Sequence, residues 1–155
     1  MSQILKKFTT IRVEGTKRFV VKDGLVRANI GWTGLNFNKL FLDVIEEDIE
    51  ATTLTIHSLV KASHDDSIIS ELGEHAKIKL AYFFGLLEKQ SKGEAGPLLV
   101  SKYGNVAYIT DVGGTIWTLG ACWSTHHGYW HMEAFSTECP IIWSIREQVL
   151  SLDCG

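Results

Sequence analysis

Hydrophobic residues in the middle of the chain recur at steps of three and four, which is the spacing of one face of an α-helix. These positions are Ile69, Leu72, Ala76, Leu80, Phe83 and Leu87. Asp65, Asp66 or Ser67 can cap the free N–H groups at the start, and the later run GEAGP cannot continue a helix. The pattern predicts one long helix over about residues 66–91.

The second half of this predicted helix, KLAYFFGLLEK, is apolar on more than one face. Ile78, Tyr82 and Leu86 form a second stripe beside the first. A helix that is apolar nearly all round must be enclosed in a core or covered by a partner. We therefore expect this segment to be sandwiched in the core or to form a subunit interface, and the second alternative predicts a homodimer.

Two β-rich runs in KRFVVKDGLVRANIG flank the residues Lys22, Asp23 and Gly24. Asp-Gly is a favoured two-residue turn because both positions tolerate a positive φ. This pattern predicts a β-hairpin near the N-terminus, and the preceding run TTIRVEG predicts a further strand.

Residues 37–61 leave two alternatives open. The apolar positions that fit one face of a helix are Phe37, Phe41, Val44, Ile45 and Ile49. The run TLTIHSLV alternates and is rich in β-branched residues, as strands are. The segment is therefore either a helix followed by a strand or a hairpin that turns at EED.

After Pro97, four short runs separated by YGN, VGG and THHG predict an antiparallel meander. The final PIIWSIREQVLSLD predicts a short helix or a last strand. Together these elements predict an α+β fold in a single domain, residues 1–155: an N-terminal hairpin, one long helix with a possible second before it, and a C-terminal meander that packs on the helix.

One register of the last hairpin of the meander places its apolar side chains on one face and its polar side chains on the other. The cross-strand pairs expected around a THHG loop with Gly128 in the left-handed region are Ser124–Tyr129, Trp123–Trp130, Cys122–His131 and Gly120–Glu133. The apolar face then carries Trp117, Leu119, Ala121, Trp123, Trp130, Met132 and Ala134. A slip of one residue would place polar side chains among the tryptophans, so burial selects this register.

The polar face of the hairpin places Cys122 opposite His131, with Glu133 as an orienter of the imidazole. This is the arrangement of a nucleophilic thiol and its base. A cysteine in the middle of a strand lacks nearby free N–H groups for an oxyanion hole, so we expect packing rather than catalysis here. On this face and on the helix, Tyr129, Ser124 and Tyr82 are the candidate ligand-binding residues.

His126 and His127 are weak metal candidates, because adjacent histidines in a tight loop point apart. We expect no metal and no cofactor. The three cysteines, Cys122, Cys139 and Cys154, cannot all pair within one chain, so we expect reduced thiols. No run approaches the length of a membrane span, so we expect a cytoplasmic protein with no membrane partner.

The net charge of −3 does not favour a polyanionic partner, but the first 27 residues are basic, with seven cations against two acids. A nucleic-acid-associated protein that uses Lys17, Arg18, Lys22 and Arg27 is therefore one alternative, with a Cys–His hydrolase or transferase as another. The sequence favours a non-catalytic regulatory module that binds a small molecule or a protein and forms a homodimer.

Overall fold

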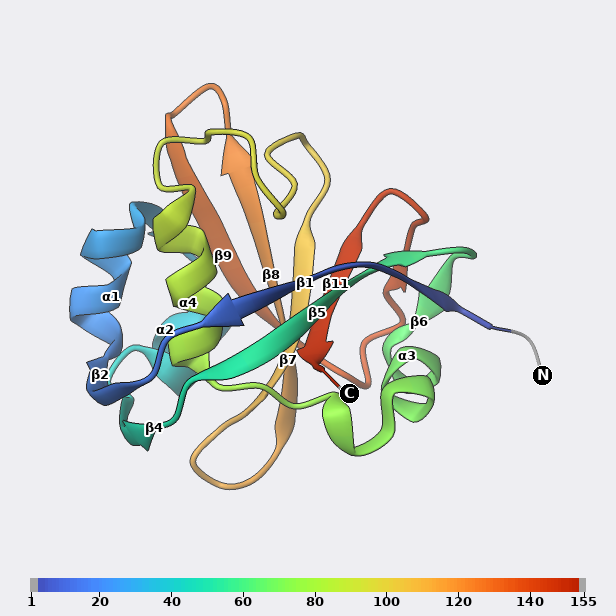
Figure 1. Cartoon of the computed structure of the whole chain (residues 1–155), viewed down its shortest axis with the longest axis horizontal. Coiled ribbons are helices and arrows are strands. Elements are labelled where there is room, and N and C mark those ends of the chain that lie inside the picture. The colour runs from blue at the N-terminus through green and yellow to red at the C-terminus, as the bar shows by residue number, and fades with distance from the viewer. Residues whose placement is uncertain (1–2, 154–155) are drawn as a thin grey trace.

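Seven strands form one twisted mixed sheet in the order β1-β5-β11-β7-β8-β9-β3 (Figure 1). The computed structural model describes residues 3–153. The strands of this sheet are β1 (Leu5–Val13), β3 (Ile30–Thr33), β5 (Thr52–Leu59), β7 (Asn105–Thr110), β8 (Ile116–Ser124), β9 (Tyr129–Ser136) and β11 (Gln148–Leu152). Neighbours are antiparallel except in the pairs β11–β7 and β3–β9, which are parallel. The sheet therefore places strands from both ends of the chain side by side.

Helices cover both faces of the sheet (Figure 1). One face carries α1 (Val21–Ala28), α2 (Leu35–Phe41) and α4 (Leu80–Lys89), and the other carries α3 (Asp65–Leu72) with a short 3-10 turn (Gly73–His75). Two small ladders complete the fold, one of β2 (Thr16–Val20) with β4 (Ile45–Ile49) and one of β6 (Ser63–His64) with β10 (Ile142–Trp143). The α+β class predicted from the sequence is confirmed.

Alternation along the strands divides the interior into two clusters. In β7, Ala107 and Ile109 face the larger cluster with α1, α2 and α4, whereas Val106 and Tyr108 face the smaller one under α3. Successive side chains of a strand point to opposite faces, so one strand supplies both clusters. A sheet buried on both faces explains why the middle of this strand, VAYI, is a continuous run of hydrophobic residues.

The apolar side chains on the several faces of α4 pack against other parts of the same chain. Phe84 makes an edge-to-face contact with Phe19 of β2 and stacks on Phe37 of α2. Its helix packs against α1, β1 and β4, which leaves Tyr82 and Leu86 buried as well. The segment is thus sandwiched in the core, the first of the two expected alternatives. The homodimer stays a prediction, without this helix as its argument.

The prediction of one long helix over 66–91 is wrong, because the chain breaks it between α3 and α4. Gly73 has φ +61°, and Lys77 then pairs with Tyr108 of β7 in an isolated bridge. Glu46 of β4 accepts hydrogen bonds from the free N–H groups of Leu80 and Ala81, at 2.9 and 2.8 Å. Partners that are distant in the sequence therefore provide the hydrogen bonds that a continuous helix would have made.

The hairpin predicted around Lys22, Asp23 and Gly24 is also wrong, because these residues lie in α1. The buried residues of this helix are Val21, Gly24 and Ala28, at helical spacing. Asn29 ends the helix with φ 59°. Asp23 and Gly24 therefore do not form a turn, and Gly24 instead packs against the side chains of Phe19 and Phe84.

Residues 37–61 form a short helix followed by two strands, so the helix-then-strand alternative is right only in part. The helix α2 buries Phe37 and Phe41 and ends there, whereas Ile45 and Ile49, which were expected on the helix, lie in β4. EED also lies inside β4, and β4 and β5 run in one direction beside β2 and β1, so the chain does not form a hairpin at EED. Three of the four predicted meander runs form β7, β8 and β9, whereas residues 98–104 contain no strand. The C-terminal segment forms strands β10 and β11, and the helical alternative there is wrong.

Cys122 and Cys139 are free thiols, and Cys154 lies outside the described residues. None of the helices in residues 3–153 combines the length and apolar character needed to cross a membrane.

Candidate functional site

The predicted register of the β8–β9 hairpin is confirmed pair by pair. The aligned residues include Ser124–Tyr129, Trp123–Trp130, Cys122–His131 and Gly120–Glu133. Gly128 has φ 75° in the connecting loop. The rings of Trp123 and Trp130 meet edge to face with centroids 5.4 Å apart. The hairpin therefore buries its apolar face in the larger cluster, as its alternation predicts.

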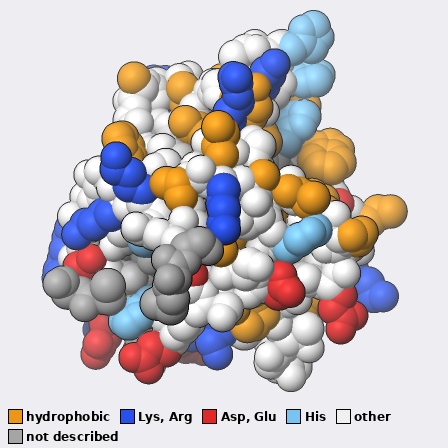
Figure 2. Space-filling view, turned by 90° about the vertical axis from the view of Figure 1, so that its right-hand side faces the viewer, with side chains coloured by type: hydrophobic (Ala, Val, Ile, Leu, Met, Phe, Trp, Pro, Cys, Tyr) orange, Lys and Arg blue, Asp and Glu red, His pale blue; other side chains and the backbone are white. Residues whose placement is uncertain are grey.

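The opposite face of this hairpin carries a row of aromatic rings. His131 lies 5.4 Å from Trp32 and 5.3 Å from Tyr129, between ring centroids, and His127 stacks on Tyr129 with an interplanar angle of 14°. Figure 2 shows histidine side chains gathered beside hydrophobic ones at the upper right of the molecule. The rings contact one another along the row, and Trp32 at its end is 46% exposed.

Trp32 comes from β3, which joins β9 in parallel with Trp32 opposite His131. The sequence pattern does not reveal this neighbour, because the pairing joins segments about a hundred residues apart. A strand of four residues next to a helix carries too little alternation to reveal its partner.

Cys122 and His131 face each other across the strands, but their environments do not favour a reactive pair. Burial raises the pKa of the Cys122 thiol, and the negative charge of Glu147 raises it further. Burial lowers the pKa of His131, and His127 adds to that decrease. A neutral thiol opposite a neutral imidazole lacks the thiolate that nucleophilic chemistry requires.

Glu133 is engaged away from His131. Its Oε1 accepts hydrogen bonds from the backbone N–H of Phe37 at 3.2 Å and of Ala134 at 2.7 Å. The first of these bonds satisfies a free donor in the first turn of α2. Nε2 of His131 has no hydrogen-bond partner within the described chain, so the structure does not bring the expected orienter to this imidazole.

The candidate residues at the β8–β9 loop contact one another within the turn. Ser124 Oγ accepts a hydrogen bond from the backbone N–H of His127 at 3.1 Å and lies 3.0 Å from Nδ1 of the same residue. His126 meets His127 edge to face. Across residues 3–153, no three His, Cys, Asp or Glu side chains are grouped so that they could hold a metal ion.

Tyr82, the candidate on the helix, is buried, and its hydroxyl donates to the carbonyl oxygen of Glu50 at 2.6 Å. It also lines a cavity of about 520 Å³ between β4, β7 and the start of α4. Its hydroxyl is already paired, so its role here is mainly to fill space.

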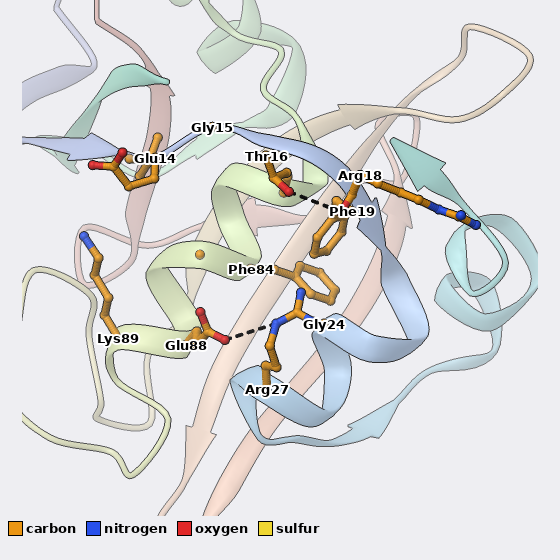
Figure 3. Close-up of a pocket in the computed structure, with 13 residues that line it drawn as sticks. Glu14, Gly15, Thr16, Arg18, Phe19, Gly24, Arg27, Phe84, Glu88 and Lys89 are labelled. Carbon is orange, nitrogen blue, oxygen red and sulfur yellow. Dashed lines mark hydrogen bonds and ion pairs between the residues drawn. The ribbon is translucent and has the colours of Figure 1, made fainter. Parts of the chain in front are cut away.

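A cleft of about 430 Å³ opens between the β1–β2 junction, α1 and α4 (Figure 3). Its lining residues are Val13, Glu14, Gly15, Thr16, Arg18, Phe19, Gly24, Arg27, Ala81, Phe84, Gly85, Glu88 and Lys89. The volume falls within the range of roughly 300–1,000 Å³ in which small-molecule sites occur. This cleft joins three segments of the chain and is a candidate ligand site.

Three glycines line the cleft, and at two of them the neighbouring atoms leave no room for a side chain. A Cβ atom on Gly15 would come within 2.3 Å of the carbonyl oxygen of Ile49, and one on Gly24 would come within 2.7 Å of the Phe19 ring. Gly85 differs, because a Cβ atom there would meet no atom within 4 Å. The space above Gly85 is the cleft itself.

Charged side chains surround this space. Arg27 Nε lies 3.2 Å from Glu88 Oε1, and both side chains are about half exposed, at 52% and 46%. In Figure 3 the end of Arg27 lies beside Phe84, whereas Arg18 runs away from that ring. Lys89 and Glu14 lie at the other end of the cleft.

The sequence predicts a basic surface that combines Arg18 and Arg27 with Lys17 and Lys22. In the structure Lys22 instead pairs with Asp43 at 2.9 Å, outside the cleft. The signal that could have revealed the site is the single glycine within the apolar run LAYFFGLLEK, which has no local role in a helix.

Comparisons with protein-family models, with curated proteins and with solved structures gave no match to this chain.

Proposed function

We propose that this chain is a non-catalytic binding module that holds a small molecule in the cleft between the β1–β2 junction, α1 and α4. The observation that carries the proposal is Gly85. A glycine within a helix costs roughly 0.5–1 kcal/mol relative to alanine, and no neighbouring atom requires it at this position. A residue that weakens its own helix and leaves a cleft open is best explained by what the cleft holds.

The walls of the cleft support binding more than chemistry. Val13, Phe19 and Phe84 provide apolar contact, and charged side chains stand at both ends. The lining contains neither cysteine nor histidine, and the hydroxyl of Thr16 donates to the carbonyl oxygen of Arg18. These features are those of a pocket that fixes a ligand by shape and a few polar groups.

The test is a fragment titration of the full-length, isotope-labelled chain, followed by the chemical shifts of its backbone amides. We expect fragments to shift the amides of Gly15, Gly24 and Gly85 in the wild type. Gly85→Leu places a side chain in the open space and is expected to abolish these shifts. Ser67→Leu adds the same side chain at an exposed position of α3 and serves as the matched control.

The proposal is abandoned if no fragment shifts the cleft amides, or if the shifts persist unchanged in a folded Gly85→Leu variant. Gly85→Ala provides a milder version that keeps the helix intact should the leucine variant fold poorly.

A further inference from the structure

We infer that the ligand of this cleft is a small organic monocarboxylate with an apolar body, whose carboxylate binds the terminal amino groups of Arg27. This inference rests on the proposed function and names the class of ligand.

The Arg27–Glu88 pair leaves the binding end of the guanidinium free. Glu88 contacts Arg27 through Nε, and no second carboxylate forms an ion pair with Arg27 in residues 3–153. A guanidinium presents its donors in a fixed fork that matches the two oxygens of a carboxylate. Glu88 thus orients Arg27 from the side without occupying the fork.

The charges that face the cleft favour an anion of low charge. Arg27 and Lys89 line the cleft together with Glu14 and Glu88, whereas the side chain of Arg18 points away from it (Figure 3). Lys89 has no ion-pair partner among the described residues. A monoanion can therefore pair with a cation at either end, whereas a phosphate dianion would face two carboxylates.

The apolar body has a defined place next to Arg27. Gly85 leaves the surface of α4 open, and Phe84 and Ala81 lie beside it on the same helix, with Val13 on the opposite wall. In Figure 3 the end of Arg27 lies beside the ring of Phe84. A ligand that pairs with Arg27 can therefore lay its body over Gly85.

Phenylacetate is the probe, and its neutral isostere phenylacetamide, the amine phenylethylamine and inorganic phosphate are the comparison ligands. Amide shifts of the full-length chain are followed at concentrations up to about 10 mM, which detects weak binding. We expect phenylacetate to shift the amides of Gly24 and Gly85 and to bind at least about tenfold more tightly than phenylacetamide.

Two variants separate ligand binding from a structural role of the ion pair. Arg27→Gln is expected to weaken phenylacetate binding by about tenfold or more, whereas Glu88→Gln leaves the fork in place, removes a negative charge and is expected to maintain or strengthen binding. A purely structural pair would make the two variants equivalent. Lys22→Gln changes a lysine that pairs with Asp43 outside the cleft and serves as the control.

The inference is overturned if phenylacetate produces no shift, if phosphate or the amine binds as tightly, or if Arg27→Gln leaves the affinity unchanged. Neutral fragments that still shift the cleft amides in those cases would leave the proposed binding module standing. Loss of every fragment response would instead remove the proposed function itself.

Discussion

Tyr108, in the middle of β7, donates a hydrogen bond from its hydroxyl to Oδ1 of Asp65, at the start of α3, over 2.9 Å. Trp143 of β10 donates its indole N–H to the same oxygen at 2.7 Å. Asp65 is almost fully buried, and its Oδ2 has no hydrogen-bond partner within the described chain. One carboxyl oxygen therefore joins α3 and β10 to the sheet, instead of capping the helix as its position suggested.

We predict that Asp65 makes stability depend on pH. Burial raises the pKa of Asp65 above its ordinary value of 3.8, although hydrogen bonds from Trp143 and Tyr108 oppose the shift. Its contribution is therefore fully present below about pH 3.8 and is lost as the pH rises through the folded-state pKa. Asp65→Asn keeps an oxygen acceptor but does not ionise. Its free energy of unfolding relative to wild type should increase between about pH 4 and pH 7 in urea titrations.

Asp65→Ala provides the contrast. It leaves the buried hydroxyl of Tyr108 and the indole N–H of Trp143 without their acceptor, so we expect a loss of roughly 2–4 kcal/mol. Equal stability of the alanine and asparagine variants at all pH values would contradict this account.

We predict that Glu46 stabilises the start of α4. Its carboxylate accepts bonds from the N–H groups of Leu80 and Ala81, so Glu46→Ala should lower the free energy of unfolding by about 1–2 kcal/mol. Glu46→Gln retains one acceptor and should lose less. Glu47→Ala changes the exposed neighbour, and its effect should stay within about 0.5 kcal/mol. Equal losses in Glu46→Ala and Glu47→Ala would show that the bonds contribute nothing.

We predict opposite signs for alanine at two glycines of the cleft. Gly85→Ala should stabilise the protein by roughly 0.5–1 kcal/mol, because alanine is a better helix former and finds open space. Gly24→Ala should destabilise it by about 1–3 kcal/mol, because the Cβ atom would lie 2.7 Å from the ring of Phe19. Thermal unfolding of both variants measures the difference. Destabilisation by both substitutions would mean that Gly85 has a packing role.

We predict that Cys122 is slow to alkylate at neutral pH. Burial and the charge of Glu147 raise the pKa of its thiol, so its thiolate appears only at a higher pH than for an ordinary cysteine. Cys139 is exposed and should react first with iodoacetamide. Peptide mapping by mass spectrometry after timed labelling distinguishes the two. Fast labelling of Cys122 at pH 7 would return the Cys–His alternative to consideration.

The β8–β9 hairpin shows what the sequence by itself determined. Its strands are adjacent in the chain, its loop carries Gly128 with a positive φ, and its apolar positions alternate with period two. All of this information lies within about 20 residues, and a slip of one residue would place polar side chains among the tryptophans of the hairpin. The registers of Trp123 with Trp130 and of Cys122 with His131 were therefore predictable. The surroundings of the polar face could not be predicted, because the rings around His131 include Trp32 from a distant strand.

Tertiary structure decided the rest, because the deciding partners come from elsewhere in the chain. Periodicity across residues 66–91 fits a helix, but Glu46 binds the N–H groups that begin α4, and Tyr108 draws the preceding segment to the sheet. The Asp-Gly turn signal yields to the packing of Gly24 on Phe19 and Phe84. The cleft likewise exists only when the β1–β2 junction meets α1 and α4. Local patterns specify which faces are apolar, whereas only the folded chain specifies which residues cover them and which space stays open.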